Sequence, residues 1–257
     1  MSHYRYQRTI SLLLSLEIPR WNGGQRALRR AFDIIFALHG LAFLAPLWAM
    51  IAFAIKLDDG GPVFYSQLRV GQGLRKFRML KFRSMVPDPA CSSPLTAPKD
   101  ARVTRVGRFL RKYKLDELPQ LVNVLRGEMR LVGVRPQVGR YVEMFRTEYE
   151  ELLHAPPGIT GLSTLRFCHE EHLFQEGSIE EQYIGKILPR KLKLALEYER
   201  SRTFLSDLEI LFQTILSLAS PSAKSSSRAP NLLLPALEKT FPKDSDERST
   251  KPILKGI

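Results

Sequence analysis

The chain has 257 residues, which allows one large domain or two small ones, and its 44% hydrophobic and 25% charged residues are typical of an ordinary globular protein. Lys and Arg number 39 against 26 Asp and Glu, and the net charge of +13 indicates a polyanionic partner: nucleic acid, an anionic membrane surface or a phosphate-bearing substrate. With two cysteines and no CxxC motif, the composition argues against a small disulfide-bonded secreted protein and against a structural zinc site.

The N-terminal segment contains one short apolar stretch, residues 10–16. This stretch is too short and too interrupted for the hydrophobic region of a signal peptide, and no small-residue cleavage site follows it. We expect residues 1–28 to form an amphipathic lead-in that lies on a membrane surface.

A long uncharged segment, residues 34–55, follows between Asp33 and Lys56. About 20 apolar residues are enough to cross a bilayer as one helix. Pro46 lies near the middle of the segment, where it removes a backbone donor and favours a kink. Basic residues flank both ends, and the positive-inside rule favours both on the cytoplasmic side. We therefore predict a re-entrant helix-break-helix over residues 29–56, with a spanning helix and a buried soluble helix as alternatives.

A β-hairpin is predicted after the uncharged segment. The pattern indicates strands over residues 63–70 and 77–85, a turn over 71–73 between them, and a loop over 86–100. The two glycines of the turn do not form a nucleotide-binding loop, because the third glycine and the following helix are missing.

Four arginines recur at every third position after this loop: Arg102, Arg105, Arg108 and Arg111. On a helix they make a drifting basic face. Two interpretations stay open, a solvated helix surface or contact with phosphates and anionic lipid head groups.

Two adjacent carboxylates, Asp116 and Glu117, lie at the start of another predicted helix, which Gly127 ends. Apolar residues at i, i+3, i+4 and i+7 define one face of this helix: Leu118, Leu121, Val122 and Leu125. Acidic residues at a helix start commonly cap free N–H groups, which is one interpretation of the pair. The other is chemical, because two ionised acids among arginines at a membrane surface can hold a magnesium ion and attack phosphorus.

The remaining chain alternates apolar runs, turns and helices. We predict an apolar run over 131–134, a helix over 141–153, a rigid turn over 156–161, and one or two helices over 186–218 with a buried apolar face over 205–218. His169 and His172 have metal-ligand spacing, but no other residue supplies fixed ligands, so no metal site is predicted there. Residues 220–257 are rich in Ser, Pro and Lys and are predicted to form a disordered basic tail.

Several motifs occur in a fixed order: Arg30-Ala31-Phe32-Asp33, Gly61-Pro62-Val63-Phe64, Lys81-Phe82-Arg83-Ser84-Met85, the segment 102–111, Leu115-Asp116-Glu117-Leu118-Pro119-Gln120, Leu131-Val132-Gly133-Val134-Arg135-Pro136, and Pro157-Gly158-Ile159-Thr160-Gly161. Together they closely resemble the bacterial sugar transferase family, the monotopic phosphoglycosyl transferases that begin exopolysaccharide and glycan assembly. The resemblance extends over residues 25–218.

The resemblance implies a mixed α/β fold. It implies a re-entrant membrane helix-break-helix followed by a cytosolic α/β catalytic body, residues 57–219, with interfacial amphipathic helices that contact membrane lipid. The implied location is the cytoplasmic face of the bacterial inner membrane, as a monotopic protein. The oligomeric state is open, and a homodimer is compatible with the sequence.

The resemblance also implies an activity, which is transfer of a sugar 1-phosphate from a UDP-sugar to undecaprenyl phosphate with release of UMP. By this match Asp116 is the nucleophile that forms a covalent phosphosugar intermediate, with Mg²⁺ beside it. Glu117 is its partner in metal binding or acid–base work. The expected substrate-binding residues are Lys81, Arg83, Arg108, Arg111, Arg135 and Pro136.

Departures from the family pattern occur at Val134, Pro156 and residues 163–168, away from the acidic pair, so the resemblance does not imply which sugar is transferred. A second hypothesis is a catalytically weak membrane scaffold that recruits polysaccharide-assembly enzymes. The net charge also suits nucleic acid, but the uncharged segment and the acidic pair have no use in that role, so we predict no nucleic-acid partner.

Overall fold

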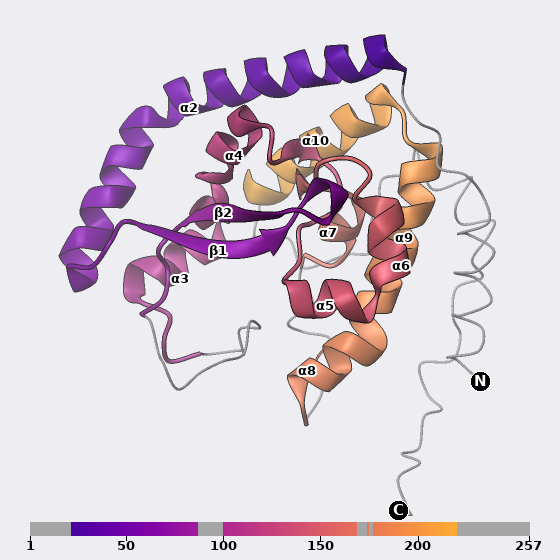
Figure 1. Ribbon diagram of the computed structural model, residues 1–257. Helices are drawn as coiled ribbons and strands as arrows, with labels where there is room; N and C mark the ends of the chain where they lie inside the picture. Colours follow the sequence, from indigo (N-terminus) through magenta and orange to yellow (C-terminus); the bar gives the residue numbers. More distant parts are fainter. Residues whose placement is uncertain (1–21, 87–99, 169–173, 175–176, 220–257) are drawn as a thin grey trace, which may run out of the picture. The chain divides into compact units, whose positions relative to one another are not determined.

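Figure 1 shows the computed structural model, which describes residues 22–86, 100–168, 174 and 177–219. The beginning of the predicted lead-in, most of the predicted loop, both histidines of the 169–172 spacing and the predicted tail lie outside the described residues. The chain divides into two units, residues 1–221 and 222–257, and all described structure belongs to the first. This unit is a mixture of helices and two small sheets, as predicted.

One long apolar helix, α2 (Gly23–Asp59), begins the described chain. Asn22 starts it with a capping box to Gln25, and Gly60 ends it in the left-handed conformation with φ at 70°. Among the described residues it is the one helix long and apolar enough to cross a membrane, by length and composition alone. Pro46 lies inside α2, and Figure 1 shows its ribbon bent into two arms. The predicted break is thus a bend within a continuous helix, and re-entrant insertion stays a prediction.

The predicted hairpin is confirmed by the antiparallel strands β1 (Phe64–Val70) and β2 (Lys76–Phe82). A short 3-10 turn, η1 (Gln72–Leu74), joins the strands. Phe77 and Met79, on one face of β2, are buried, and because side chains alternate along a strand this face of the hairpin points into the body.

A second sheet pairs β3 (Arg130–Val132) with β4 (Gly158–Thr160) in parallel. The prediction of a rigid turn over 156–161 is therefore wrong, because three of these residues form a strand. The backbones approach so closely that a Cβ on Gly158 would lie 2.1 Å from the Gly133 nitrogen, so a side chain has no room there. Glycine and proline look like turn residues in the sequence, whereas here glycine allows close strand pairing.

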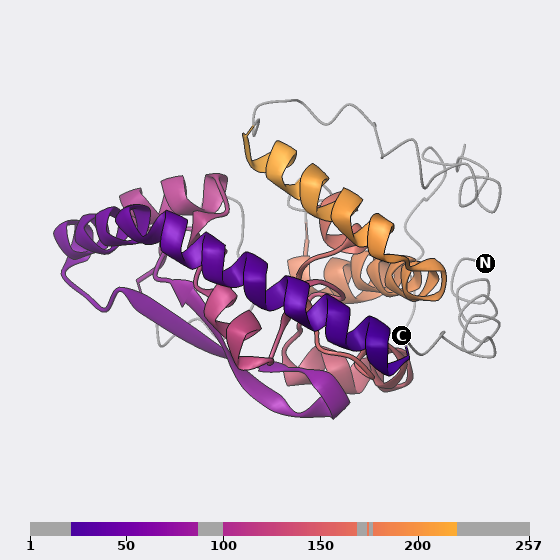
Figure 2. The ribbon, with the colours of Figure 1, turned by 90° about the horizontal axis from the view of Figure 1, so that it is seen from above.

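Short helices surround these sheets, and Figure 2 shows α2 running diagonally across the near side of the unit. The helices after the hairpin are α3 (Arg105–Lys112), η2 (Leu115–Glu117), α4 (Gln120–Arg126), α5 (Gly139–Met144), α6 (Arg146–Leu152), α7 (Leu162–Arg166), α8 (Ile179–Gln182), η4 (Tyr183–Ile187), α9 (Leu188–Ser201) and α10 (Phe204–Ala219). Two apolar clusters hold them together. One joins α5, α6, η4 and α9, and the other packs α2 and α3 against the end of β2.

The prediction that residues 141–153 are helical is largely confirmed, in two helices that meet at Phe145, whose φ and ψ of −127° and 42° are not helical. Two other helical features differ from their predictions. Arg102 lies before α3 and forms an ion pair with Asp100 at 2.6 Å, so only three of the four periodic arginines lie on the helix.

The apolar run over 205–218 forms α10, but its predicted buried face is largely exposed. Ile210 is fully buried, whereas the side chains on the other side of the helix are open. Leu205 is 76% exposed and Phe212 61%, so α10 packs against the body by one side only. We call the exposed set the α10 outer face: Leu205, Phe212, Ile215 and Leu216.

Candidate active site

The acidic pair lies on η2, a single 3-10 turn between α3 and α4. The residue before the turn, Lys114, has a left-handed backbone with φ at 54°, which is uncommon for a residue with a side chain. No side-chain cap is formed at the start of η2 or of α4, so the structure gives no support to the helix-capping interpretation of Asp116 and Glu117. The pair lies instead against the inward face of the β1–β2 hairpin, which η2 contacts through β2.

Glu117 is the charge partner of two cations from different elements. Lys81 on β2 approaches Oε1 at 3.2 Å. Arg135, after β3, donates through Nη1 to Oε2 at 3.0 Å and pairs through Nη2 with Oε1, so its guanidinium binds the carboxylate in a bidentate manner. Burial alone would raise the pKa of Glu117, but Arg135 and Lys81 outweigh it and hold the pKa well below its usual range.

Asp116 has the opposite environment, although it is the next residue. Its side chain is buried, and Oδ1 has no hydrogen-bond partner among the residues that the structure describes. Burial, followed by the negative charge of Glu117, raises the pKa of Asp116, while Lys81, Arg111 and Lys114 oppose that shift. A buried carboxylate oxygen that the protein leaves unpaired is free to bind a ligand or to react.

The structure brings together some of the other predicted site residues. Lys81 and Arg135 meet at Glu117, and Pro136 is buried directly after Arg135. Arg111 on α3 is close enough to act on the pKa of Asp116, and its Nη1 lies 3.4 Å from Met85 Sδ. Arg108, on the same helix, is exposed to solvent.

Arg83 was predicted to bind substrate, but in the structure its contacts are with other parts of the chain. Its guanidinium is buried and forms an ion pair with Asp59, the last residue of α2. Its backbone N–H donates to the Val63 carbonyl at 2.9 Å. These contacts fasten the end of β2 to the end of α2, so Arg83 serves the packing of the hairpin.

Sequence reasoning did not single out Arg69, a third cation beside Glu117. It lies on β1. After burial, its positive charge is one of those that lower the pKa of Lys81. Burial and Arg135 lower the pKa of Arg69 itself, while Glu117 opposes that shift. The signal in the sequence was strand alternation, because Arg69 and Lys81 belong to the same face of the predicted hairpin.

Asp116 suits the predicted magnesium ion. Mg²⁺ prefers oxygen ligands and is commonly held by one or two carboxylates together with substrate phosphates. Both oxygens of Glu117 are bound by Lys81 and Arg135, which leaves the unpaired Oδ1 of Asp116 as the best protein ligand. Within the described ranges no group of three or more His, Cys, Asp and Glu residues is placed to hold a metal, so substrate oxygens would have to complete the shell.

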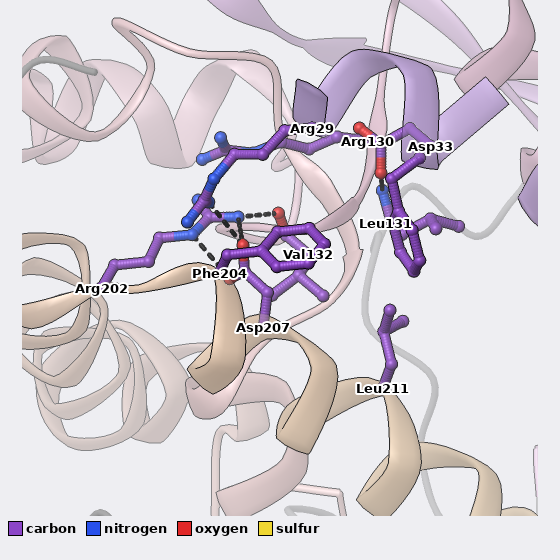
Figure 3. A pocket seen from close by; sticks show the side chains of 10 residues that line it. Arg29, Asp33, Arg130, Leu131, Val132, Arg202, Phe204, Asp207 and Leu211 are labelled. Atoms are coloured by element: carbon purple, nitrogen blue, oxygen red, sulfur yellow. Dashed lines mark hydrogen bonds and ion pairs between the residues drawn. The ribbon is translucent and has the colours of Figure 1, made fainter. Parts of the chain in front are cut away.

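A second buried charged group lies away from the acidic pair, where α2, β3, α9 and α10 meet (Figure 3). Asp207 pairs with Arg29 and accepts from Arg202 Nε at 2.7 Å, and Arg202 in turn donates to the Val132 carbonyl at 2.7 Å. We call this set the charged junction: Arg29, Arg130, Glu199, Arg202 and Asp207. The small pocket beside it is not lined by either residue of the acidic pair.

The fold and site define a mixed α/β protein with one long apolar helix and a carboxylate pair among cations. A family model described as "Bacterial sugar transferase" matches residues 24–221. The chain therefore belongs to the bacterial sugar transferase family, and the predicted transferase class is confirmed.

Relatives with similar sequences carry names of related meaning. An "Undecaprenyl-phosphate glucose phosphotransferase" of Komagataeibacter xylinus is 40% identical over 195 residues, which cover 73% of this chain but only 35% of that protein. "Exopolysaccharide production protein ExoY" of Sinorhizobium fredii is 33% identical over 227 residues, covering 80% of this chain and 94% of that protein. A "UDP-glucose:undecaprenyl-phosphate glucose-1-phosphate transferase" of Caulobacter vibrioides is 36% identical over 198 residues, covering 74% and 69%.

Proposed function

We propose that this protein transfers a sugar 1-phosphate from a UDP-sugar to undecaprenyl phosphate, as the first membrane step of exopolysaccharide or glycan assembly. The names of its relatives support the two substrates. The observation that carries the proposal is the unpaired, buried Oδ1 of Asp116 beside a carboxylate whose own charge is already balanced.

The first half of the proposed reaction takes place at Asp116. A carboxylate oxygen attacks the β-phosphorus of the UDP-sugar, and the bond from this phosphorus to the bridging oxygen breaks. UMP leaves with the electron pair, and the phosphosugar stays on Asp116 as an acyl phosphate. In the second half a phosphate oxygen of undecaprenyl phosphate attacks the same phosphorus, which frees the Asp116 carboxylate and gives the lipid diphosphate sugar.

Neighbouring side chains supply the electrostatics of this reaction. Glu117 fixes the positions of Lys81 and Arg135, whose positive charges stabilise phosphate oxygens as negative charge develops on the transferred group. Arg111 lies close enough to Asp116 to favour its ionised form, which is the form that attacks. Mg²⁺, held by Asp116 with Glu117 adjacent, would neutralise phosphate charge as a Lewis acid.

The membrane part of the proposal concerns α2. We propose that α2 enters the cytoplasmic leaflet of the inner membrane and returns, so that the body and the lipid phosphate meet at the interface. The bend, Pro46 and the exposed apolar side chains Phe43, Met50 and Phe53 support this. Single cysteines at Gly23 and Lys56 should both react with a membrane-impermeant thiol reagent from the cytoplasmic side, and reaction from opposite sides would indicate a spanning helix.

UMP release by protein purified in nanodiscs tests the activity, with undecaprenyl phosphate, Mg²⁺ and a panel of UDP-sugars. We expect release with one sugar or a small group of them, and its loss both with EDTA and in Asp116→Asn. Arg78→Gln, at an exposed position on the face of the hairpin opposite Lys81, separates a specific effect at Asp116 from a general loss of basic surface. Full turnover by Asp116→Asn would remove Asp116 as the nucleophile.

A further inference from the structure

We propose that Arg69 is a substrate-binding residue, which supplies an additional cation for the diphosphate group of the nucleotide substrate. This inference rests on the proposed function for the identity of the ligand, a nucleoside diphosphate ester. It concerns a residue of β1, outside every motif that carried the sequence resemblance.

The register of the hairpin places Arg69 on the face that carries Lys81. β1 and β2 pair Arg69 with Phe77, Gln67 with Met79 and Tyr65 with Lys81. Residues directly opposite each other share a face, and so do alternate residues along each strand, so these six side chains point to one side. Because Lys81 reaches Glu117 from this side, Arg69 points toward the same carboxylate, whose charge also acts on the pKa of Arg69.

A backbone connection holds Arg69 next to the Arg135 segment. The Val70 N–H donates to the Gln137 carbonyl at 2.9 Å, so the end of β1 is joined to the residue two positions after Arg135. The side chain of Gln137 is also fixed, because its Nε2 donates to the Tyr183 hydroxyl at 2.9 Å. The position of Arg69 relative to Arg135 is therefore set by the fold.

The side-chain hydrogen bonds that the structure gives the Arg69 guanidinium go to neutral amide oxygens. Its Nη2 and Nε donate to Gln67 Oε1 at 2.6 and 3.2 Å, and its Nη1 lies 3.4 Å from Gln137 Oε1. Lys81 and Arg135, by contrast, share the single carboxylate of Glu117. Three cations therefore surround one paired carboxylate and Asp116, which leaves an excess of positive charge in a partly buried place.

The energetic cost of keeping Arg69 charged also favours a role in binding an anion. Burial and the nearby positive charge of Arg135 lower the pKa of Arg69 to about 10, so the guanidinium is charged at neutral pH but at an energetic cost. A structural role in hydrogen bonding to two amides does not need a cation. A diphosphate does, because its oxygens accept charge-assisted hydrogen bonds from a planar guanidinium.

Two substitutions separate a binding role from a packing role. Arg69→Lys keeps the positive charge but loses the fork of donors. Gln67→Glu keeps the shape and the hydrogen bonds to Arg69 but neutralises its charge, and should leave thermal stability unchanged or higher. The matched control is Arg78→Lys on β2, because Arg78 is exposed on the opposite face of the hairpin.

Two readouts are needed, binding of UDP or inorganic pyrophosphate by calorimetry, and KM and kcat for UMP release. We expect both substitutions to weaken UDP binding and raise KM by about tenfold or more, as loss of a charge-assisted hydrogen bond predicts. Arg78→Lys should match the wild type. Wild-type UDP binding and KM in folded Arg69→Lys and Gln67→Glu would overturn the inference.

The outcomes also distinguish this inference from the proposed function. If the wild type binds pyrophosphate through Arg69 but releases no UMP, the anion site stands and the proposed reaction falls. If Asp116→Asn is inactive while Arg69→Lys is unaffected, the reaction stands and the role of Arg69 falls. If the wild type binds neither anion, both fall.

Discussion

Asp116 and Glu117 are neighbours in the chain, yet the fold treats their charges in opposite ways. Glu117 is bound by Lys81 and Arg135, so its ionised form is stabilised. Asp116 is buried with an unpaired oxygen, so its ionised form is penalised. This difference divides the work of the pair, since one carboxylate positions cations and the other remains available for reaction.

A pair of neutralising substitutions should therefore change stability in opposite directions at pH 7. Asp116→Asn removes a buried negative charge whose burial penalty exceeds the attraction of the nearby cations, and should stabilise the fold by about 1 kcal/mol or more. Glu117→Gln leaves Lys81 and Arg135 without their counter-charge and should destabilise it by about 2–4 kcal/mol. Thermal unfolding of the two variants beside the wild type measures both effects, and shifts of the same sign would contradict this assignment.

The pH dependence of the Asp116 effect has a defined sign. Because its folded pKa is raised, the penalty is present in full above that raised pKa and disappears as pH falls below the unfolded value of about 3.9. The stability advantage of Asp116→Asn over the wild type should thus shrink as pH is lowered through the raised pKa. Denaturant unfolding at a series of pH values measures it, and an advantage that is constant across this range would contradict the raised pKa.

The identities of these residues could be predicted from the sequence, but their environments could not. The position of Asp116-Glu117 before a helix was compatible with capping and with chemistry, and only the fold shows that neither side chain caps a helix. Arg83 shows the same limit, because its partner Asp59 lies 24 positions away and belongs to α2. Contacts between distant segments decide such cases, and a local pattern does not contain them.

At the scale of single elements, α10 differs most from its prediction. Its apolar run was predicted to form a buried face, but the side turned to the body also carries the buried polar residues Ser206 and Asp207. The structure buries Ile210 and joins Thr214 to Thr160 of β4 at 2.8 Å, which leaves the α10 outer face open. An exposed apolar face of this kind suits the interface of a membrane, where α2 is proposed to insert.

Charge on the α10 outer face should weaken membrane binding. Phe212→Glu and Ile215→Glu place a carboxylate at the proposed lipid interface, while the buried side of the helix is unchanged. Co-sedimentation of detergent-extracted protein with anionic vesicles measures the effect, and a several-fold loss is expected. Ser217→Glu adds the same charge at an exposed polar position and should bind like the wild type. Equal binding by all three variants would exclude α10 from the interface.

At the scale of the whole unit, the charged junction connects α2 to the body formed by β3, α9 and α10. Asp207 pairs with Arg29 of α2 and with Arg202, and Glu199 pairs with Arg202 and Arg130 of β3. Buried ion pairs of this kind add little net stability when intact, but removing one member leaves buried charges without partners. The junction therefore fixes α2 relative to the body that carries the acidic pair.

Asp207→Asn should destabilise the protein by about 3 kcal/mol or more, because Arg29 and Arg202 both lose a buried counter-charge. Chemical unfolding monitored by fluorescence provides the measurement. Glu150→Gln, which removes an exposed i,i+4 pair with Arg146, is the control and should leave the unfolding free energy essentially unchanged. Similar effects of the two substitutions would mean that the junction does not hold the unit together.

At this scale the mixed fold, the long apolar helix and the hairpin could be predicted, because each leaves a periodic or compositional pattern in a continuous segment. The β3–β4 pair and the charged junction could not, because both depend on residues far apart in the chain. Asp207 and Arg29, for example, are separated by 178 positions. Their pairing follows from the approach of the start of α10 to α2, where the Phe204 and Phe32 rings also meet, and no local pattern contains such a contact.

The covalent intermediate on Asp116 is the central claim, and intact-mass spectrometry tests it most directly. Protein incubated with the accepted UDP-sugar and Mg²⁺, without undecaprenyl phosphate, should gain the mass of one phosphosugar on the peptide that contains Asp116. The adduct should disappear when undecaprenyl phosphate is added and should never form in Asp116→Asn. Turnover without any adduct, or an adduct on another residue, would contradict the proposed mechanism.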